Sequence, residues 1–125
     1  MKKKILVVDD QEGFTSVLRL NLESTNQYET RVVNVSKETV RIAEEFKPDL
    51  ILLDVVMPEL KGSEIAKSLK YHPQLKDVPI VFFTATVTPE TLTKQEGLLE
   101  GYDYIAKPGK LEEILEVIER NLHQG

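Results

Sequence analysis

The chain has 125 residues, of which 41% are apolar and 30% charged, with a net charge of −5 and no cysteine. A chain of this length is expected to form one domain around an ordinary core. The lack of cysteine excludes disulfides, thiolate zinc sites and cysteine nucleophiles, and it fits a cytoplasmic location. The acidic balance argues against direct nucleic-acid binding, and apolar runs of about five residues are too short to span a membrane.

Five short runs rich in apolar and β-branched residues predict β-strands. They are Ile5–Val8, Thr30–Val35, Leu50–Leu53, Ile80–Phe83 and Tyr102–Ala106. Four of them are apolar almost throughout, which is typical of strands buried on both faces of a parallel sheet. The run Thr30–Val35 carries Arg31 and Asn34, so we expect it at an edge of the sheet.

Segments with helical signals follow the strands. The apolar faces expected on four of these helices are Phe14, Val17, Leu18 and Leu22; Val40, Ala43 and Phe46; Ile65, Ala66 and Leu69; and Leu111, Ile114, Leu115, Ile118 and Leu122. The second helix is expected to have Ser36 as its N-cap and to end before Pro48. Another helix is expected to open at Thr88-Pro89 and to close at Gly101.

The order of strand and helix, repeated five times, predicts an α/β fold. Right-handed crossovers place helices on both faces of a parallel five-stranded sheet, in a doubly wound three-layer sandwich of the flavodoxin-like kind. The strand order expected for such a (βα)5 chain is 2-1-3-4-5, with the second strand at an edge. The ligand crevice of such a sheet lies at the carboxyl ends of the strands, between the first and third.

Polar residues follow four of the five predicted strands. Asp9-Asp10 follows the first, Asp54 the third, Thr84 the fourth and Lys107 the fifth. Each has an ordinary alternative, since an Asp after a strand often caps the next helix, Thr84 could form a turn and Lys107 could be a solvated loop lysine. Two adjacent acids cannot both be one N-cap, however, and three clustered carboxylates repel each other unless a cation is present. The combination therefore favours a functional site.

The residue types at this rim indicate phosphoryl chemistry. Carboxylates with no His or Cys beside them offer hard oxygen ligands, which suit Mg²⁺ or Mn²⁺. Asp54 lies at the centre, where a carboxylate can act as a nucleophile and form an acyl phosphate. A hydroxyl from Thr84 and an ammonium from Lys107 would hold the phosphoryl oxygens.

This pattern resembles the receiver domain of two-component response regulators, the phosphoacceptor part of a histidine–aspartate phosphorelay. The resemblance covers essentially the whole chain. Its carriers are Lys4-Ile5-Leu6-Val7-Val8-Asp9-Asp10; Asp49-Leu50-Ile51-Leu52-Leu53-Asp54-Val55-Val56-Met57-Pro58 with Gly62 beyond; Phe83-Thr84-Ala85; and Tyr104-Ile105-Ala106-Lys107-Pro108. All four motifs occur in the family's order and spacing.

The resemblance implies a role for each site residue. Asp54 would be the phosphorylated aspartate, and Thr84 and Lys107 would grip the phosphoryl group. The Mg²⁺ ligands would be Asp9, Asp10, Asp54 and the backbone carbonyl of Val56. Tyr104 would be the aromatic switch residue, which turns inward after Thr84 moves.

The resemblance also implies partners. A sensor histidine kinase or a phosphotransfer protein would supply the phosphoryl group. The signal would leave through the surface made by the helix over 88–101, the strand over Tyr102–Ala106 and the last helix, by binding a protein target or a second copy. We expect residues 1–125 to form one receiver domain with no output domain in this chain. The domain would be no enzyme beyond its own phosphotransfer and slow autodephosphorylation. The autodephosphorylation is expected to be slow because apolar Val56 cannot position an attacking water by hydrogen bonding.

Three other interpretations compete with this one. A phosphatase of the haloacid-dehalogenase kind needs a second acid two residues after the nucleophile, whereas Asp54 is followed by Val55-Val56. A flavodoxin-like or nucleotide-binding protein needs a Gly-rich phosphate loop, and Gly13 stands alone after the first strand. A pseudo-receiver that binds partners without being phosphorylated stays open.

Overall fold

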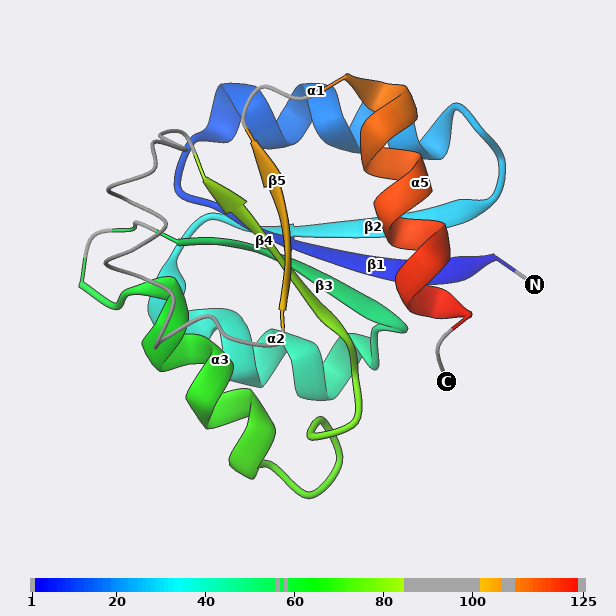
Figure 1. The fold of residues 1–125 in the computed structure, drawn as a ribbon. Helices are drawn as coiled ribbons and strands as arrows, with labels where there is room; N and C mark the ends of the chain where they lie inside the picture. The colour runs from blue at the N-terminus through cyan, green and yellow to red at the C-terminus, as the bar shows by residue number, and fades with distance from the viewer. Residues whose placement is uncertain (1, 56, 58, 85–101, 107–109, 124–125) are drawn as a thin grey trace.

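The computed structural model describes residues 2–55, 57, 59–84, 102–106 and 110–123. Its elements, in chain order, are β1 (Lys3–Val8), α1 (Glu12–Glu23), β2 (Tyr28–Val33), the 3₁₀ turn η1 (Ser36–Glu38), α2 (Thr39–Phe46), β3 (Leu50–Asp54), α3 (Gly62–Tyr71), β4 (Ile80–Thr84), β5 (Asp103–Ala106) and α5 (Leu111–Leu122). The strands form one parallel sheet in the order β2-β1-β3-β4-β5, which confirms the predicted fold class and strand order (Figure 1).

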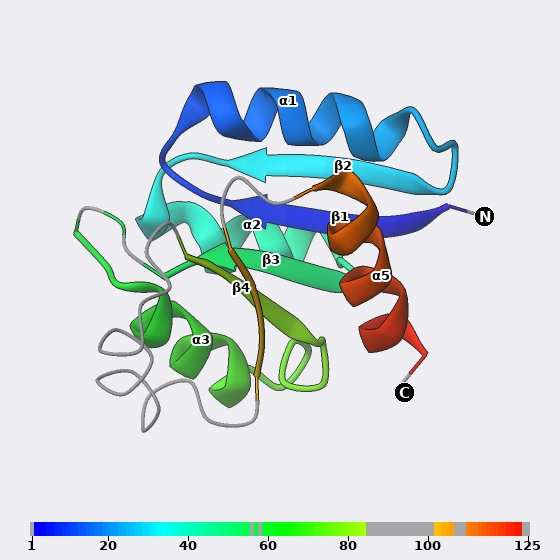
Figure 2. The same ribbon diagram turned by 45° about the horizontal axis from the view of Figure 1, so that its top comes forward.

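Two apolar clusters hold the helices against opposite faces of the sheet. Residues of α2 and α3 pack with one set of strand side chains, and residues of α1 and α5 pack with the alternate set. The ribbon accordingly has α2 and α3 on one side of the sheet and α1 and α5 on the other (Figure 2). The central strands are therefore buried on both faces; every side chain from Leu50 to Leu53 is 0% exposed. Burying one such side chain contributes about 1.5–3 kcal/mol, so this part of the sheet is a rigid base for whatever follows the strands.

The parallel registers bring the carboxyl ends of β1 and β3 together. Val8 pairs with Leu53 across these strands, and Asp54 pairs with Phe83 of β4. The chain continues past β1 into Asp9, and the last residue of β3 is Asp54 itself. Asp9 and Asp54 therefore lie at the carboxyl ends of neighbouring strands, at one edge of the sandwich, as the sequence predicted.

Several details of the predicted elements are wrong, and β1 already begins two residues before the expected Ile5. Strand β2 begins and ends two residues earlier than expected, because Tyr28 is buried against the α1/α5 cluster while Val35 is 49% exposed. Ser36 does not cap the second helix; it begins η1, and α2 starts at Thr39 with Glu38 in the capping position. Val17 was expected on the buried face of α1 but is 58% exposed.

Thr15 takes a buried place on α1 instead of Val17. Its hydroxyl donates to the backbone oxygen of Glu12 (3.1 Å) and accepts from the amide nitrogen of Asn34 (3.1 Å), so its polar atom is satisfied inside the sandwich. The predicted helix over 88–101 lies outside the described residues. Among the described helices, none has the length and apolar character needed to cross a membrane.

Candidate functional site

Three carboxylates meet at the carboxyl ends of β1 and β3. One oxygen from each of Asp9, Asp10 and Asp54 lies within 4.8 Å of the others. Asp9 and Asp54 are buried, at 0% and 5% exposure, whereas Asp10 is exposed. The sequence predicted this convergence from the positions of the acids after neighbouring strands, and the geometry confirms it.

Asp9 is held in place through its side chain and its backbone. Its Oδ1 accepts a hydrogen bond from the backbone N–H of Gln11 (2.9 Å), and its own N–H donates to Val33 O (3.0 Å). The side-chain amide of Asn34 donates to the Asp9 carbonyl oxygen (2.8 Å). These contacts tie the turn after β1 to the end of β2, so the Asp9 carboxylate is oriented before any ligand binds.

Neither Asp9 nor Asp10 is the N-cap of α1, so the structure does not contain the helix-capping alternative. The N-cap position of α1 is Gln11, which makes no side-chain capping bond. Asp9 and Asp10 both precede that position, and their carboxylates converge on Asp54 instead. The pair is therefore arranged around the third carboxylate, at the crevice expected for a ligand in this fold.

Asp54 is fixed by the close approach of α3 to the end of β3. Gly62, the first residue of α3, donates its N–H to Val55 O (2.9 Å), and Val55 N–H donates to Phe83 O (3.0 Å). A Cβ atom on Gly62 would collide with the Asp54 carbonyl oxygen and lie 2.9 Å from the Val55 Cα. Only glycine lets the helix begin this close to the strand.

The donor set fits a small divalent cation of the Mg²⁺ type. The converging atoms are carboxylate oxygens, which hard cations prefer, and within the described residues the cluster includes no His. Oxygen ligands of an octahedral Mg²⁺ lie about 3–4 Å apart, so oxygens already within 4.8 Å of one another need only small movements. A cation would also offset the repulsion among three like charges.

The remaining predicted site residues are described only in part. Thr84 ends β4, where its backbone pairs with Ala106 of β5, but its side chain is not described. Val56 and Lys107 lie outside the described residues. Tyr104 lies on β5, half-buried against the cluster that α2 and α3 cover. Its neighbour Tyr102 packs edge-to-face on Phe82, with ring centroids 5.1 Å apart.

Asn34 helps to position Asp9, a role that was not predicted from the sequence. Its polar side chain in a strand-like run was interpreted only as a sign of an edge strand. In the structure it lies just past β2 and bridges Asp9 to Thr15 of α1. A polar side chain directly after Val32-Val33, at the carboxyl end of the strand, was the available signal, but its partners are distant in sequence.

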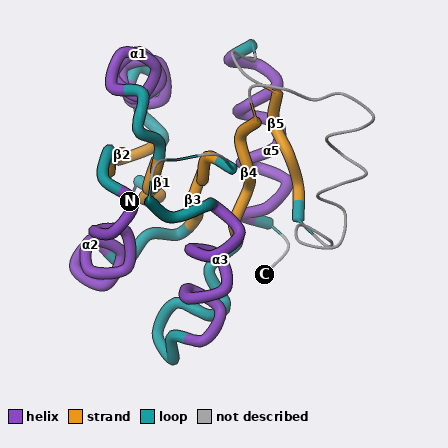
Figure 3. The backbone as a smooth tube through the Cα atoms, turned by 90° about the vertical axis from the view of Figure 1, so that its left-hand side faces the viewer, coloured by secondary structure: helices purple, strands orange, loops and turns teal. Residues whose placement is uncertain are grey.

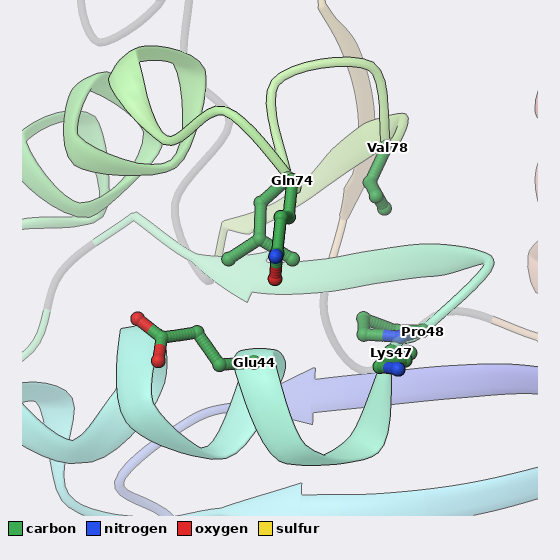
Figure 4. A pocket seen from close by; sticks show the side chains of 6 residues that line it. Glu44, Lys47, Pro48, Gln74 and Val78 are labelled. Atoms are coloured by element: carbon green, nitrogen blue, oxygen red, sulfur yellow. The ribbon is translucent and has the colours of Figure 1, made fainter.

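A cavity of about 410 Å³ lies at the other end of the sheet and is not part of this site. Its lining includes Lys47 and Pro48, which precede β3, and Val78, which precedes β4. Figure 4 shows Glu44 of α2 and Gln74 of the α3–β4 connection at its rim. His72 Nε2 lies 2.9 Å from Oε1 of Glu44, one of the lining residues.

Comparisons with known proteins agree with this geometry. The family called response regulator receiver domain matches residues 5–119. The polar-differentiation response regulator DivK of Brucella anthropi is 32% identical over 123 residues, which make up 98% of this chain and 98% of DivK. Among solved structures, the chemotaxis protein CheY4 of Vibrio cholerae has a TM-score of 0.85 at 26% identity, covering 97% of this chain and 99% of CheY4.

Other relatives are longer than this chain. The alkaline phosphatase synthesis transcriptional regulatory protein PhoP of Bacillus subtilis is 41% identical over 109 residues, which are 86% of this chain and 43% of PhoP. The phosphate regulon transcriptional regulatory protein PhoB of Rhizobium meliloti is 30% identical, and the match spans 54% of its length. The chain thus spans about half of these two regulators.

The fold and the cluster of three acids define a signalling domain of the receiver class. The chain belongs to the response regulator receiver domain family, the receiver part of two-component systems.

Proposed function

We propose that this receiver domain accepts a phosphoryl group on Asp54 and passes the signal on by a change of surface. The observation that carries the proposal is the cluster of Asp9, Asp10 and Asp54, with oxygens within 4.8 Å of one another at the carboxyl ends of β1 and β3. A buried carboxylate beside two others is the arrangement that suits a nucleophile next to a cation site.

The proposed donor is a phosphohistidine on a sensor kinase or a phosphotransfer protein. An Asp54 carboxylate oxygen attacks the phosphorus, the P–N bond breaks with its electron pair going to the imidazole, and an acyl phosphate forms on Asp54. The imidazole then takes a proton from solvent. Thr84 and Lys107 are proposed to hold two of the phosphoryl oxygens, by hydrogen bonding and by charge.

Asp9, Asp10 and Asp54 are proposed to bind Mg²⁺ together with the carbonyl oxygen of Val56. The bound ion would supply positive charge that offsets the negative phosphoryl oxygens during transfer. Asp9 is already oriented for this by the Gln11 N–H and by Asn34. Asp10, which is exposed, is the carboxylate with most freedom to adjust to the ion.

The proposed output is a change in the surface made by residues 88–101, β5 and α5. The phosphoryl oxygens and the negative charge that phosphorylation adds at Asp54 draw the Thr84 hydroxyl inward, and Tyr104 follows, which shifts a two-state surface toward one form. The described part of this surface includes exposed acids on α5, namely Glu112, Glu113, Glu116 and Glu119. The proposed partner is therefore another protein or a second copy, rather than nucleic acid. Residues 1–125 are proposed to act as one receiver domain in a cytoplasmic pathway.

Acetyl phosphate with Mg²⁺ tests the phosphoacceptor proposal directly. Intact-protein mass spectrometry should find one added phosphoryl group on the wild type, and none on Asp54→Ala or after chelation of Mg²⁺. Asp77→Ala, at an exposed aspartate before β4, is the matched control and should be labelled like the wild type. An unlabelled wild type would overturn the proposal and favour the pseudo-receiver.

A further inference from the structure

Strand β2 forms an open edge of the sheet. It pairs with β1 on one side and ends the strand order, and α1 and α2 flank it above and below (Figure 3). The N–H of Lys3 donates to Gln27 O and the N–H of Asp9 donates to Val33 O, so the odd-numbered residues of β2 turn their backbone groups toward β1. Because the direction alternates along a strand, Tyr28, Thr30 and Val32 present theirs to the open edge.

One side chain covers the centre of this edge. The outward N–H of Thr30 donates to Glu23 Oε2 (3.2 Å), in the last turn of α1. Arg19 Nε lies 3.5 Å from the other Glu23 oxygen and holds the carboxylate over the strand. A polar cavity of about 490 Å³, lined by Arg19, Glu23 and Thr30 among others, runs beside β2. The edge therefore has room beside it, and within the described residues one charged side chain, that of Glu23, closes it.

The exposed edge is also complementary to itself. In an antiparallel pair with Thr30 opposite Thr30 of a second copy, Tyr28 lies opposite Val32, and Glu29 lies opposite Arg31. The Thr30–Thr30 and Tyr28–Val32 pairs consist of residues whose backbone groups face the open edge. In this register the two members of each pair exchange backbone hydrogen bonds. Glu29 and Arg31 are exposed, and their side chains share the face of the sheet that α2 covers. Each would meet its opposite charge at the close, non-hydrogen-bonded positions.

We propose that the open edge of β2 is a pairing surface for a second copy of this chain, and that Glu23 keeps it closed. The pair is an isologous two-fold dimer in which the two sheets join through β2. Opening requires Glu23 to leave the Thr30 N–H, which then bonds to the carbonyl oxygen of the facing Thr30. A charged side chain over an exposed edge is a common means of preventing such pairing, and here it acts on one defined hydrogen bond.

Two substitutions at the same position separate the blocking hydrogen bond from net charge. Glu23→Ala removes the acceptor, whereas Glu23→Gln removes the charge but keeps an amide oxygen that can accept from Thr30. Sedimentation equilibrium without any phosphodonor should give Glu23→Ala a dimer dissociation constant at least about tenfold lower than that of the wild type. Glu23→Gln should stay within about threefold of the wild type. Equal behaviour of both variants would overturn the blocking role of the hydrogen bond.

The charge pairs test whether the dimer uses β2 in this register. In the Glu23→Ala background, Glu29→Arg faces Arg31 of the second copy and should return the protein to monomer. The further change Arg31→Glu restores opposite charges and should restore the dimer. A Glu23→Ala dimer that Glu29→Arg leaves intact would overturn the proposed interface.

Amide hydrogen exchange at Thr30 gives a readout at the site itself. In dilute Glu23→Ala the Thr30 amide should exchange faster than in the wild type, because its acceptor is gone. At concentrations where the variant dimerises, the same amide should become protected. Exchange at Thr30 that is equal in both proteins at every concentration would contradict the proposal even if the charge variants were poorly folded.

Discussion

The carbonyl oxygen of Asp54 fills the space that a Cβ atom on Gly62 would need. The backbone of the predicted phosphoacceptor and the first residue of α3 are thus in direct contact, and the Gly62 N–H donates to Val55 O (2.9 Å). The helix can start at this point because glycine has no side chain. The position of the Asp54 carboxylate therefore depends on a residue eight positions later in the chain.

Gly62→Ala should destabilise the domain and disturb Asp54. The added methyl group meets backbone atoms, which cannot rotate away, so the strand end or the helix must move. Overpacking of this kind costs about 1–3 kcal/mol of unfolding free energy, measurable by urea denaturation. Acetyl phosphate labelling of Asp54 should slow as well, because the carboxylate moves relative to Asp9 and Asp10.

Gly13→Ala is the matched control. This glycine lies in the first turn of α1, and a Cβ atom there would meet nothing within 4 Å. Alanine is the better helix former, so the variant should be equal to the wild type or about 0.5–1 kcal/mol more stable. Similar losses for the two alanine variants would contradict the close-contact explanation.

Val56→Asn should shorten the lifetime of the proposed acyl phosphate. Val56 stands two residues after Asp54, and its apolar side chain offers no hydrogen bond to an attacking water. An asparagine amide can orient such a water, so phosphoryl loss should be several-fold faster. The decay of the labelled mass after removal of acetyl phosphate gives the rate. An unchanged rate would remove Val56 from the list of residues that set the lifetime.

Much of the fold was predictable because its signals are local. The runs Leu50–Leu53 and Ile80–Phe83 are apolar throughout, and they form the central strands that the sandwich buries on both faces. The limits of β2 were not predictable, because they depend on its pairing with β1, in which Lys3 faces Tyr28. That register is a contact between segments distant in sequence. The exposure of Val17 likewise depends on the rotation of α1 about its own axis where it packs on the sheet.

The acidic site was predictable for a related reason. Asp9, Asp10 and Asp54 each follow or end an apolar strand, and parallel strands bring such positions together. The contacts that orient the site were less accessible. Asn34 reaches Asp9 from the residue just after β2, and the fit of Gly62 against Asp54 depends on the angle at which α3 packs on the sheet. The residue types indicated the chemistry of the site, whereas these tertiary contacts determine the geometry of its carboxylates.

Asp10→Asn should make the metal-free domain more stable and less responsive to Mg²⁺. Three carboxylates with oxygens within 4.8 Å repel one another, and Asp10 is the exposed member, so its replacement disturbs no packing. In chelator we expect a gain of roughly 0.5 kcal/mol in unfolding free energy. Saturating Mg²⁺ should stabilise the wild type by on the order of 1–3 kcal/mol and the variant by clearly less.

Urea denaturation with and without Mg²⁺ measures both effects. The control is Asp77→Asn, at an exposed aspartate before β4, which removes the same charge away from the cluster. It should leave the Mg²⁺ increment as in the wild type. An equal increment in Asp10→Asn would mean that Asp10 neither binds the ion nor shares its charge.

Tyr28 should make the domain lose stability at alkaline pH. Burial against the α1/α5 cluster, and secondarily the negative charge of Glu119, raise the pKa of Tyr28 above its ordinary value. The unfolded chain therefore loses this proton first, at about pH 10, while the folded chain still holds it. The stabilisation from the neutral phenol is complete below that pH and is lost as the pH rises through the folded pKa.

Tyr28→Phe should flatten the fall of unfolding free energy between about pH 9 and about pH 11. Part of the fall should remain, because burial also raises the pKa of Tyr102. Glu119→Gln removes the secondary cause and should let Tyr28 ionise at a lower pH in an absorbance titration of the folded protein. Tyr71→Phe, at a side chain that is 80% exposed, serves as control and should lose stability with pH as the wild type does. If the unfolding free energy of Tyr28→Phe fell with pH as steeply as that of the wild type, another group would be responsible for the loss of stability at alkaline pH.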